Sequence, residues 1–175
     1  MTNLAKRIEL LANVAIIIVA LLLGVVLVKR YLLPQEQPPA ARSQIQPGTK
    51  LSLPGVDWGK SDRTLLMVIS TDCRFCTESA PFYQRLAQEK AKRGRGSIVA
   101  VLPQGADEAK KYLDDHGIAV DEIKQAIPGA VGARGTPTLV LVDRKGSVVE
   151  AWVGKLPLAQ ESGVLNRFFA NDLTE

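Results

Sequence analysis

Histidine and cysteine are rare in this sequence of 175 residues, which contains one His and two Cys. A tetrahedral zinc site built from these residue types takes four ligands, so it would need a carboxylate to complete it here. Two cysteines are also too few for a small domain held together by disulfides. The composition, 46% hydrophobic and 23% charged, excludes a disordered or collagen-like chain. The length fits one ordinary domain with a tail or an anchor.

A basic face is missing as well, although the formal net charge is +4. Residues 1–30 hold four basic side chains and one acidic one, and residues 31–175 are nearly neutral, with 18 basic and 17 acidic side chains. Nucleic-acid binders use a basic face to displace counterions from phosphates. The one basic cluster, in residues 90–95, lies at a predicted helix end, where cations complement the helix dipole. We therefore expect no nucleic-acid partner.

Residues 10–28 form a run of nineteen residues without a charged side chain. At about 1.5 Å per residue, such a helix would be roughly 28 Å long, close to the thickness of the hydrocarbon core of a bilayer. Lys29 and Arg30 follow the run at once, where a cleavage site would have small residues, and this favours a retained transmembrane anchor over a cleaved signal peptide. Basic residues stand on both sides of the run. The short tail of residues 1–9 favours an N-terminus in the cytoplasm.

Residues 29–48 are rich in proline and glutamine and poor in large apolar side chains, so they predict an extended linker. Residues 49–175 alternate strand and helix patterns and predict one folded domain. Short apolar runs predict strands at residues 64–70, 97–102, 138–143 and 148–153. Amphipathic patterns predict helices at residues 76–92, 106–116 and 158–170. This order indicates an α/β fold with a mixed central sheet and helices on both faces.

The most informative residues are Cys73-Arg74-Phe75-Cys76, which stand where a buried strand ends and a helix begins. A thiolate is favoured at a helix N-terminus, because the free backbone N–H groups and the helix dipole place partial positive charge there. Cys73 is therefore the expected nucleophile, with a lowered pKa. Cys76, two residues further along the first turn, can attack a mixed disulfide formed at Cys73.

Three other interpretations of the cysteine pair are half of a zinc site, a structural disulfide and two inert buried thiols. Zinc lacks further cysteine ligands in this chain. A structural disulfide closing so short a loop would constrain little of the unfolded chain. Inert thiols are not expected where a strand meets a helix. The position of the pair therefore favours redox chemistry.

Gly135-Thr136-Pro137 directly precedes a predicted strand, and a proline is tolerated there because its missing N–H falls at the strand end. Together with the cysteine pair, and with Pro81 and Gly154 at the matching spacings, it resembles the thioredoxin family over about residues 49–170. The resemblance implies a cis peptide bond before Pro137, which would lie against the cysteines. It also implies that the backbone of Thr136 pairs with the substrate peptide.

With its anchor and linker, the chain is similar to the membrane-anchored thioredoxin-like proteins of the bacterial cell envelope, including those of cytochrome c maturation. The resemblance implies a thiol-disulfide oxidoreductase whose domain lies outside the cytoplasm, in the periplasm. Such a protein needs no metal or other cofactor. Its partners are client proteins with thiols or disulfides and a redox protein that recharges it, and residues 10–28 hold it in the membrane.

The sequence also departs from the thioredoxin pattern. Thioredoxin has Trp before the first cysteine and a buried acid six residues before it, where this chain has Asp72 and Met67. The cytochrome-maturation reductases often carry Glu three residues after the second cysteine, where this chain has Ser79; the neighbouring Glu78 points about 100° elsewhere on a helix. Asp72 or Glu78, acting through a water, are candidate proton partners for Cys76.

Asp72, Arg74 and Phe75 are the expected tuning residues of the pair. Arg74 would stabilise a thiolate at Cys73 and Asp72 would oppose it, so the sequence leaves the redox direction open. Two rival functions keep the fold: a binding module whose cysteines do not cycle, and a peroxide reductase. Peroxiredoxins have Pro and Thr where this chain has Leu66 and Ser70, which disfavours the second rival.

Overall fold

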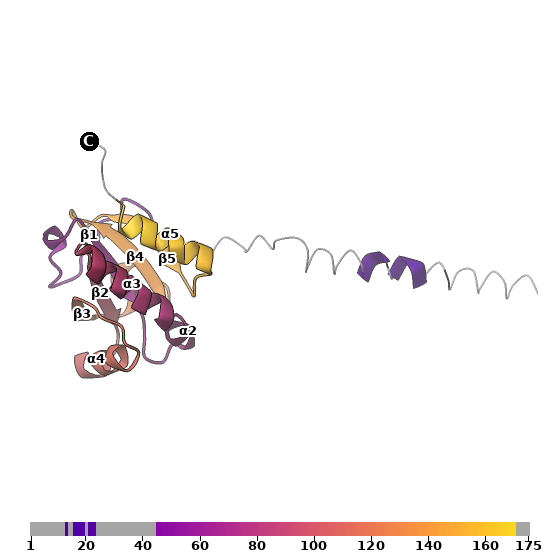
Figure 1. Ribbon diagram of the computed structural model, residues 1–175, viewed down its shortest axis with the longest axis horizontal. Helices are drawn as coiled ribbons and strands as arrows, with labels where there is room; N and C mark the ends of the chain where they lie inside the picture. Colours follow the sequence, from indigo (N-terminus) through magenta and orange to yellow (C-terminus); the bar gives the residue numbers. More distant parts are fainter. Residues whose placement is uncertain (1–12, 14–15, 20, 24–44, 171–175) are drawn as a thin grey trace, which may run out of the picture. The chain divides into compact units, whose positions relative to one another are not determined.

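The computed structural model describes residues 13, 16–19, 21–23 and 45–170 (Figure 1). Residues 45–170 form an α/β domain. The strands are β1 (Arg63–Val68), β2 (Ser97–Leu102), β3 (Glu122–Gln125), β4 (Thr138–Asp143) and β5 (Val148–Val153). The α-helices are α2 (Arg74–Glu78), α3 (Ala80–Arg93), α4 (Ala106–Asp115) and α5 (Leu158–Phe168). Two short 3-10 helices are η1 (Trp58–Lys60) and η2 (Pro128–Val131).

The five strands form one mixed sheet in the order β3-β2-β1-β4-β5. Strands β1, β2 and β3 pair in parallel, and β4 pairs antiparallel with both β1 and β5. Every residue of β1 and β2 is buried, as expected for strands covered on both faces of the sheet. The mixed central sheet expected from the sequence is confirmed.

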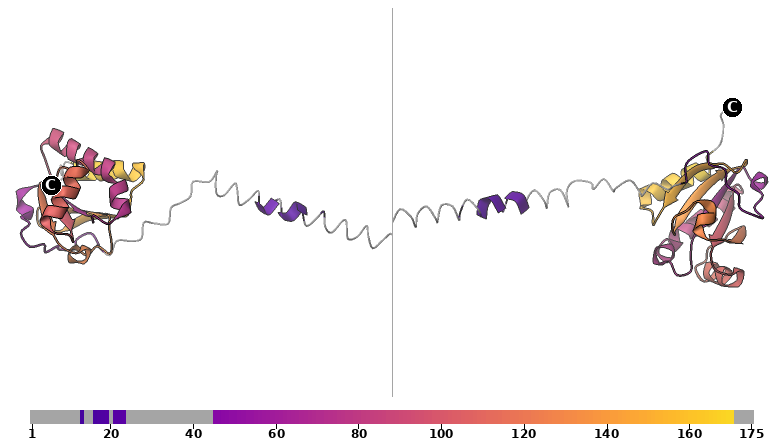
Figure 2. Two further views of the ribbon diagram at one scale, coloured as in Figure 1. Left: turned by 90° about the horizontal axis from the view of Figure 1, so that it is seen from below. Right: turned by 180° about the vertical axis from the view of Figure 1, so that it is seen from behind.

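The two faces of the sheet carry different covers. Leu65 and Met67 of β1 face a core that includes side chains of α3, α4 and α5, whereas Leu66 and Val68 face a second core. The second core is closed by the segment around Leu53, by η1 and by η2. Figure 1 and the two views of Figure 2 show the helices and the sheet from three sides.

The expectation of helices on both faces is therefore wrong for the described residues, whose α-helices all contribute to the first core. The strand order explains why. The crossovers β1-α3-β2 and β2-α4-β3 step across the sheet in the same direction, and right-handed crossovers of this kind place their helices on the same face.

Two further details differ from the sequence pattern. The expected helix at residues 76–92 is two helices, α2 and α3, which meet at Ser79. Pro81 lies in the first turn of α3, and its missing N–H cannot continue the hydrogen bonds of α2. Strand β3 was not expected, because Ile123 is its one apolar residue and an edge strand gives no buried run.

The segment predicted as the membrane anchor lies largely outside the described residues. Residues 13, 16–19 and 21–23 of it are helical. Among the residues that the structure describes, no helix is both long enough and apolar enough to span a bilayer. At the other end of the predicted linker, Ile45 is 5% exposed and packs in the second core, so the folded domain includes residues ahead of Thr49.

Candidate active site

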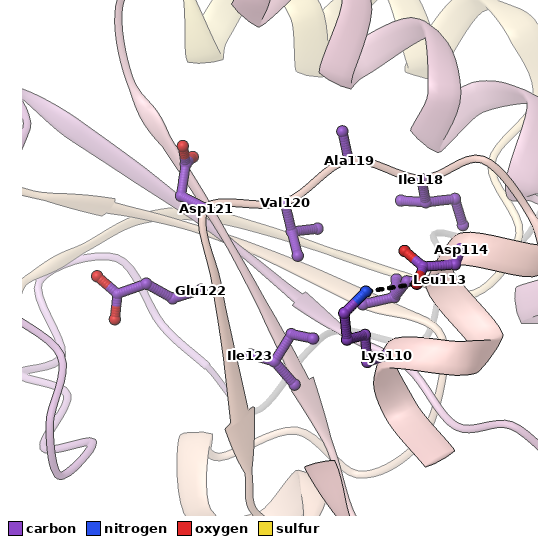
Figure 3. Close-up of a pocket in the computed structure, with 9 residues that line it drawn as sticks. All are labelled: Lys110, Leu113, Asp114, Ile118, Ala119, Val120, Asp121, Glu122 and Ile123. Carbon is purple, nitrogen blue, oxygen red and sulfur yellow. Dashed lines mark hydrogen bonds and ion pairs between the residues drawn. The ribbon is translucent and has the colours of Figure 1, made fainter. Parts of the chain in front are cut away.

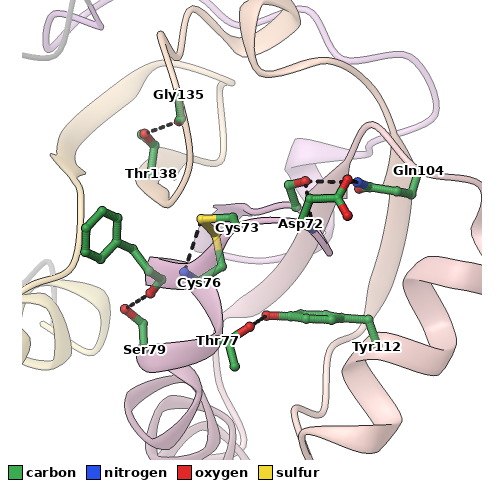
Figure 4. The surroundings of a disulfide bond; sticks show 11 residues. Asp72, Cys73, Cys76, Thr77, Ser79, Gln104, Tyr112, Gly135 and Thr138 are labelled. Carbon is green, nitrogen blue, oxygen red and sulfur yellow. Dashed lines mark hydrogen bonds between the residues drawn. A yellow bond between two sulfur atoms is a disulfide. The ribbon is translucent and has the colours of Figure 1, made fainter.

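Cys73 and Cys76 lie at the end of β1 and form a disulfide, with their Cα atoms 5.2 Å apart (Figure 4). Cys73 is the N-cap of α2, and its Sγ accepts a hydrogen bond from the backbone N–H of Cys76 at 3.1 Å. Its backbone carbonyl also accepts the N–H groups of Cys76 and Thr77. The sulfur of Cys73 is thus at a helix N-terminus, where negative charge is favoured.

The two cysteines differ in exposure. Cys73 is partly exposed, whereas Cys76 is 0% exposed and packs in the first core with residues such as Met67 and Ala80. A turn connects β1 to the cysteine pair, and the backbone N–H of Cys73 closes it by donating to the carbonyl of Ser70. An outside thiol or disulfide can therefore approach Cys73, while Cys76 is shielded from it.

The predicted substrate loop lies beside the cysteine pair. The Thr136–Pro137 peptide bond is cis, as the thioredoxin resemblance implies. Thr138 pairs with Val68, so β4 begins where β1 ends, and Figure 4 shows Gly135 and Thr138 on one side of the disulfide. Thr138 Oγ1 donates to the carbonyl of Gly135 at 2.8 Å, which holds the loop. The substrate-binding roles of Thr136 and Pro137 stay predictions.

Methionine occupies the position of the missing buried acid. Met67 is 0% exposed and belongs to the same core as Cys76. Tyr83, in that core, is 2% exposed, and burial raises the pKa of its hydroxyl far above the usual range, so Tyr83 is neutral at neutral pH. Neither residue can accept a proton from Cys76 at neutral pH.

Glu78, one of the two candidate proton partners, is already paired with cations. Its Oε1 accepts from Nε of Arg74 at 2.7 Å, and its Oε2 accepts from Nζ of Lys155 at 2.8 Å. These two hydrogen bonds, that of Lys155 before that of Arg74, hold the pKa of Glu78 below its ordinary value. Glu78 therefore stays ionised at neutral pH and is a poor proton donor.

Asp72, the other candidate, is exposed and lies in a small polar cluster. Gln104, from the loop after β2, donates to Ser70 Oγ at 2.9 Å and lies 3.5 Å from Asp72 Oδ2. The amide oxygen of Gln104, Oε1, is buried and has no hydrogen-bond partner among the residues that the structure describes. Figure 4 shows this cluster beside Cys73. Gln104 was not predicted as a site residue, because it is 32 residues from Asp72 in the chain and no motif connects the two.

The two residues between the cysteines face solvent. The side chain of Arg74 is 85% exposed, and Phe75 is 55% exposed, which is unusual for a large apolar residue. The backbone carbonyl of Phe75 accepts a hydrogen bond from Ser79 Oγ at 2.8 Å. A partner that approaches Cys73 therefore meets an aromatic ring and a guanidinium group.

His116, the single histidine of the sequence, is the C-cap of α4. Its Nδ1 lies 2.8 Å from the carbonyl of Tyr112, and the two rings are 4.3 Å apart. Among the residues that the structure describes, no three His, Cys, Asp or Glu side chains form a group that could hold a metal ion. A cavity of about 380 Å³ lies between α4 and β3 (Figure 3), and neither cysteine lines it.

The chain matches the thioredoxin-like domain family over residues 58–169, and it belongs to this family. This confirms the resemblance found in the sequence. The chain is 29% identical over 105 residues to the thiol-disulfide oxidoreductase ResA of Bacillus thuringiensis (strain Al Hakam), and equally to ResA of Bacillus anthracis. Each alignment covers 55% of this chain and 58% of the relative, so the chain spans little more than half the length of these curated relatives.

Solved structures share the fold. A protein from Chlorobium tepidum assigned as a thiol:disulfide interchange protein DsbE is 24% identical with a TM-score of 0.59, over 72% of this chain and 97% of that one. A protein from Neisseria meningitidis assigned as a thioredoxin is 20% identical with a TM-score of 0.56, over 73% of this chain and 93% of that one. At these identities the structures support the thioredoxin-like fold alone.

Proposed function

We propose that this chain is a thiol-disulfide oxidoreductase in which Cys73 is the nucleophile and Cys76 the resolving cysteine. The observation that carries the proposal is the arrangement of the pair: a partly exposed Cys73 at a helix N-terminus, a fully buried Cys76 bonded to it, and a cis-proline loop beside both. The thiol-disulfide oxidoreductases among its relatives support the same activity.

The exchange proceeds in two steps that balance. The Cys73 thiolate attacks one sulfur of a client disulfide, forms a mixed disulfide and releases the other client sulfur as a thiolate, which takes up a proton. The Cys76 thiolate then attacks Cys73 Sγ, re-forms the Cys73–Cys76 disulfide and releases the second client thiol. Two electrons pass from the pair to the client. The reverse sequence oxidises a client dithiol, and a redox partner protein returns the pair to its starting state.

The location is part of the proposal. Residues 10–28 are the membrane anchor, residues 29–44 the linker, and the thioredoxin-like domain lies on the extracytoplasmic side. The support is the uncharged run of nineteen residues and the proline-rich segment after it. Client proteins and the recharging partner would then be extracytoplasmic or membrane proteins.

Two cysteine variants test the activity. Cys73→Ser should abolish turnover of a disulfide substrate, because no nucleophile remains at the exposed position. Cys76→Ser should accumulate mixed disulfides between Cys73 and the substrate, because nothing resolves them. Turnover is measured by insulin reduction with dithiothreitol as the reductant. The mixed disulfides are detected on non-reducing gels and identified by mass spectrometry.

The double variant, Cys73→Ser with Cys76→Ser, is the blank for both measurements. Full exchange activity in this variant would overturn the proposal. So would a Cys76→Ser protein that forms no mixed disulfide at any substrate concentration while its Cys73 thiol reacts freely with iodoacetamide. The second result would favour a binding module whose cysteines do not cycle.

A further inference from the structure

Glu78 makes one contact within the cysteine helix and one outside it. Through Oε1 it binds Arg74, the residue next to Cys73, and through Oε2 it binds Lys155, in the loop between β5 and α5. The Glu78 side chain is 30% exposed, less than either of its partners. One carboxylate thus joins two cations that are far apart in the sequence.

The contact with Lys155 reaches the second half of the site. Lys155 directly follows Gly154, whose backbone N–H donates to the carbonyl of Pro137 at 2.8 Å. The loop that holds the cis-proline carbonyl is therefore also the loop that Glu78 binds. Glu78 connects the cysteine helix to the predicted substrate loop through two consecutive residues.

The charges near Cys73 make this carboxylate important. Asp72 and Arg74 flank Cys73 in the sequence, and Lys155 reaches α2 from the loop after β5. Glu108 of α4 binds Thr71 at 2.7 Å, and Arg134 lies two residues before Thr136. A guanidinium beside a thiol favours the thiolate, but Arg74 donates its Nε–H to Glu78. Glu78 thus offsets the positive charge that would otherwise act on Cys73.

We propose that Glu78 is a positioning residue that sets the reactivity of Cys73: it holds Arg74 and Lys155 in ion pairs and so keeps the Cys73 thiolate less stable and the cysteine pair less oxidising. The inference deepens the proposed function and depends on it for its consequence in exchange. A pair whose reduced, thiolate form is more stable is a stronger oxidant, so releasing the two cations should shift the pair in that direction.

The test compares Glu78→Gln with Glu89→Gln in the full chain. Glu89 is a matched control: it too is on an exposed helix surface and binds two cations, Lys92 and Arg93, but it lies near the other end of α3. Two quantities are measured: the pKa of Cys73, from the rate of iodoacetamide alkylation of the reduced protein against pH, and the equilibrium of the pair with glutathione.

Glu78→Gln should lower the pKa of Cys73, raise its thiolate fraction at pH 7, and shift the glutathione equilibrium toward the dithiol. The expected change in each is about two- to fivefold, the range that an exposed ion pair supports. Adding Arg74→Gln to Glu78→Gln should return both values toward wild type. The effect should shrink in 1 M salt, which screens exposed charges. Glu89→Gln should leave both values at those of wild type.

The proposal is wrong if Glu78→Gln and Glu89→Gln give the same alkylation profile and the same glutathione equilibrium, even where Glu78→Gln lowers the melting temperature. A melting change alone would make Glu78 merely structural. The alkylation profile needs no turnover, so it separates the two hypotheses. A shifted profile in a protein without exchange activity would overturn the proposed function but leave the role of Glu78 intact.

Discussion

Cys73 and Cys76 have the same side chain and differ in their surroundings. Cys73 caps α2 and is partly exposed, whereas Cys76 is enclosed by the first core. The sequence was sufficient to predict that Cys73 stands at the N-terminus of a helix, because the strand-to-helix junction follows from the residue pattern. That Cys73 is the attacking cysteine stays a prediction. The cis bond before Pro137 was predictable only from the family resemblance, since cis and trans X-Pro bonds share the same sequence.

The contacts of Glu78 show where prediction from sequence ends. Arg74 and Glu78 are four residues apart, and this spacing on a helix predicts their ion pair. Lys155 is 77 residues further along the chain, and only the packing of the loop after β5 brings it to the same carboxylate. Gln104 is similar: its contact with Ser70 depends on the pairing of β1 with β2.

Tyr83 gives a prediction for the pH dependence of stability. Burial raises the pKa of its hydroxyl in the folded protein above the ordinary value of 10.0. The folded state then holds a proton that the unfolded state releases above pH 10, so stability is kept below pH 10 and falls as the pH rises further, by up to about 1.4 kcal/mol per pH unit. Tyr83→Phe removes this group, and its free energy of unfolding should fall less steeply between pH 10 and 11.5.

Denaturant unfolding at a series of pH values measures the difference in slope. The free energy of unfolding of Tyr83→Phe at pH 7 serves as the control. Losing the hydroxyl changes the stability at every pH by the same amount, and this amount is subtracted before the slopes are compared. Equal slopes for wild type and variant above pH 10 would contradict the prediction.

At the scale of elements, strands were predictable where apolar residues predominate, whether the strand is buried or, like β5, partly buried. Strands β1, β2, β4 and β5 lie within one residue of the predicted starts, because each consists mostly of apolar residues. Strand β3 escaped prediction, since its residues are mostly charged or polar and half-buried at the sheet edge. The division between α2 and α3 could have been expected from Pro81, which lies five residues after Cys76.

Gly96, just before β2, tests the packing of α5. Its φ is 77°, and a Cβ built at this position would lie 2.7 Å from Cζ of Phe168 in the first core. Gly96→Ala should therefore be destabilised by two effects. The positive φ costs an alanine about 1 kcal/mol, and displacing the ring of Phe168 costs about 1–3 kcal/mol.

Gly94→Ala is the matched control. Gly94 has a φ of 62° but no atom within 4 Å of an added Cβ, so this variant has the backbone cost alone. Chemical denaturation of both variants gives the clash by difference. Equal destabilisation of the two would show that Phe168 does not pack against Gly96.

At the scale of the whole molecule, the order of the strands determines which face of the sheet each helix covers, and the sequence pattern does not reveal that order. Alternating strand and helix patterns predicted a mixed sheet, but they did not say which direction each crossover takes. Because β1, β2 and β3 are added in one direction, α3 and α4 share a face, and the other face is closed by irregular chain from Ile45 onward and by η2. Irregular cover has no periodic pattern and so was not predicted.

The proposed anchor gives a prediction for the whole chain. Expressed in bacteria, the protein should stay in the membrane fraction after extraction with alkaline carbonate. Leu21→Lys with Leu22→Lys should release it, because each lysine near the centre of the run costs about 3 kcal/mol of insertion free energy. Leu21→Ala with Leu22→Ala is the control and should stay in the membrane. Carbonate extraction of the wild type into the soluble fraction would contradict the anchor.

The most direct test of the proposed activity is a redox titration of the full-length chain in glutathione buffers, with the state of Cys73 and Cys76 measured by alkylation and mass spectrometry. The proposed chemistry predicts one reversible two-electron transition between disulfide and dithiol, at the same midpoint from either starting state, and its midpoint distinguishes a reductant from an oxidant. A pair that stays oxidised or reduced across the whole range, or that responds differently from the two starting states, would contradict it.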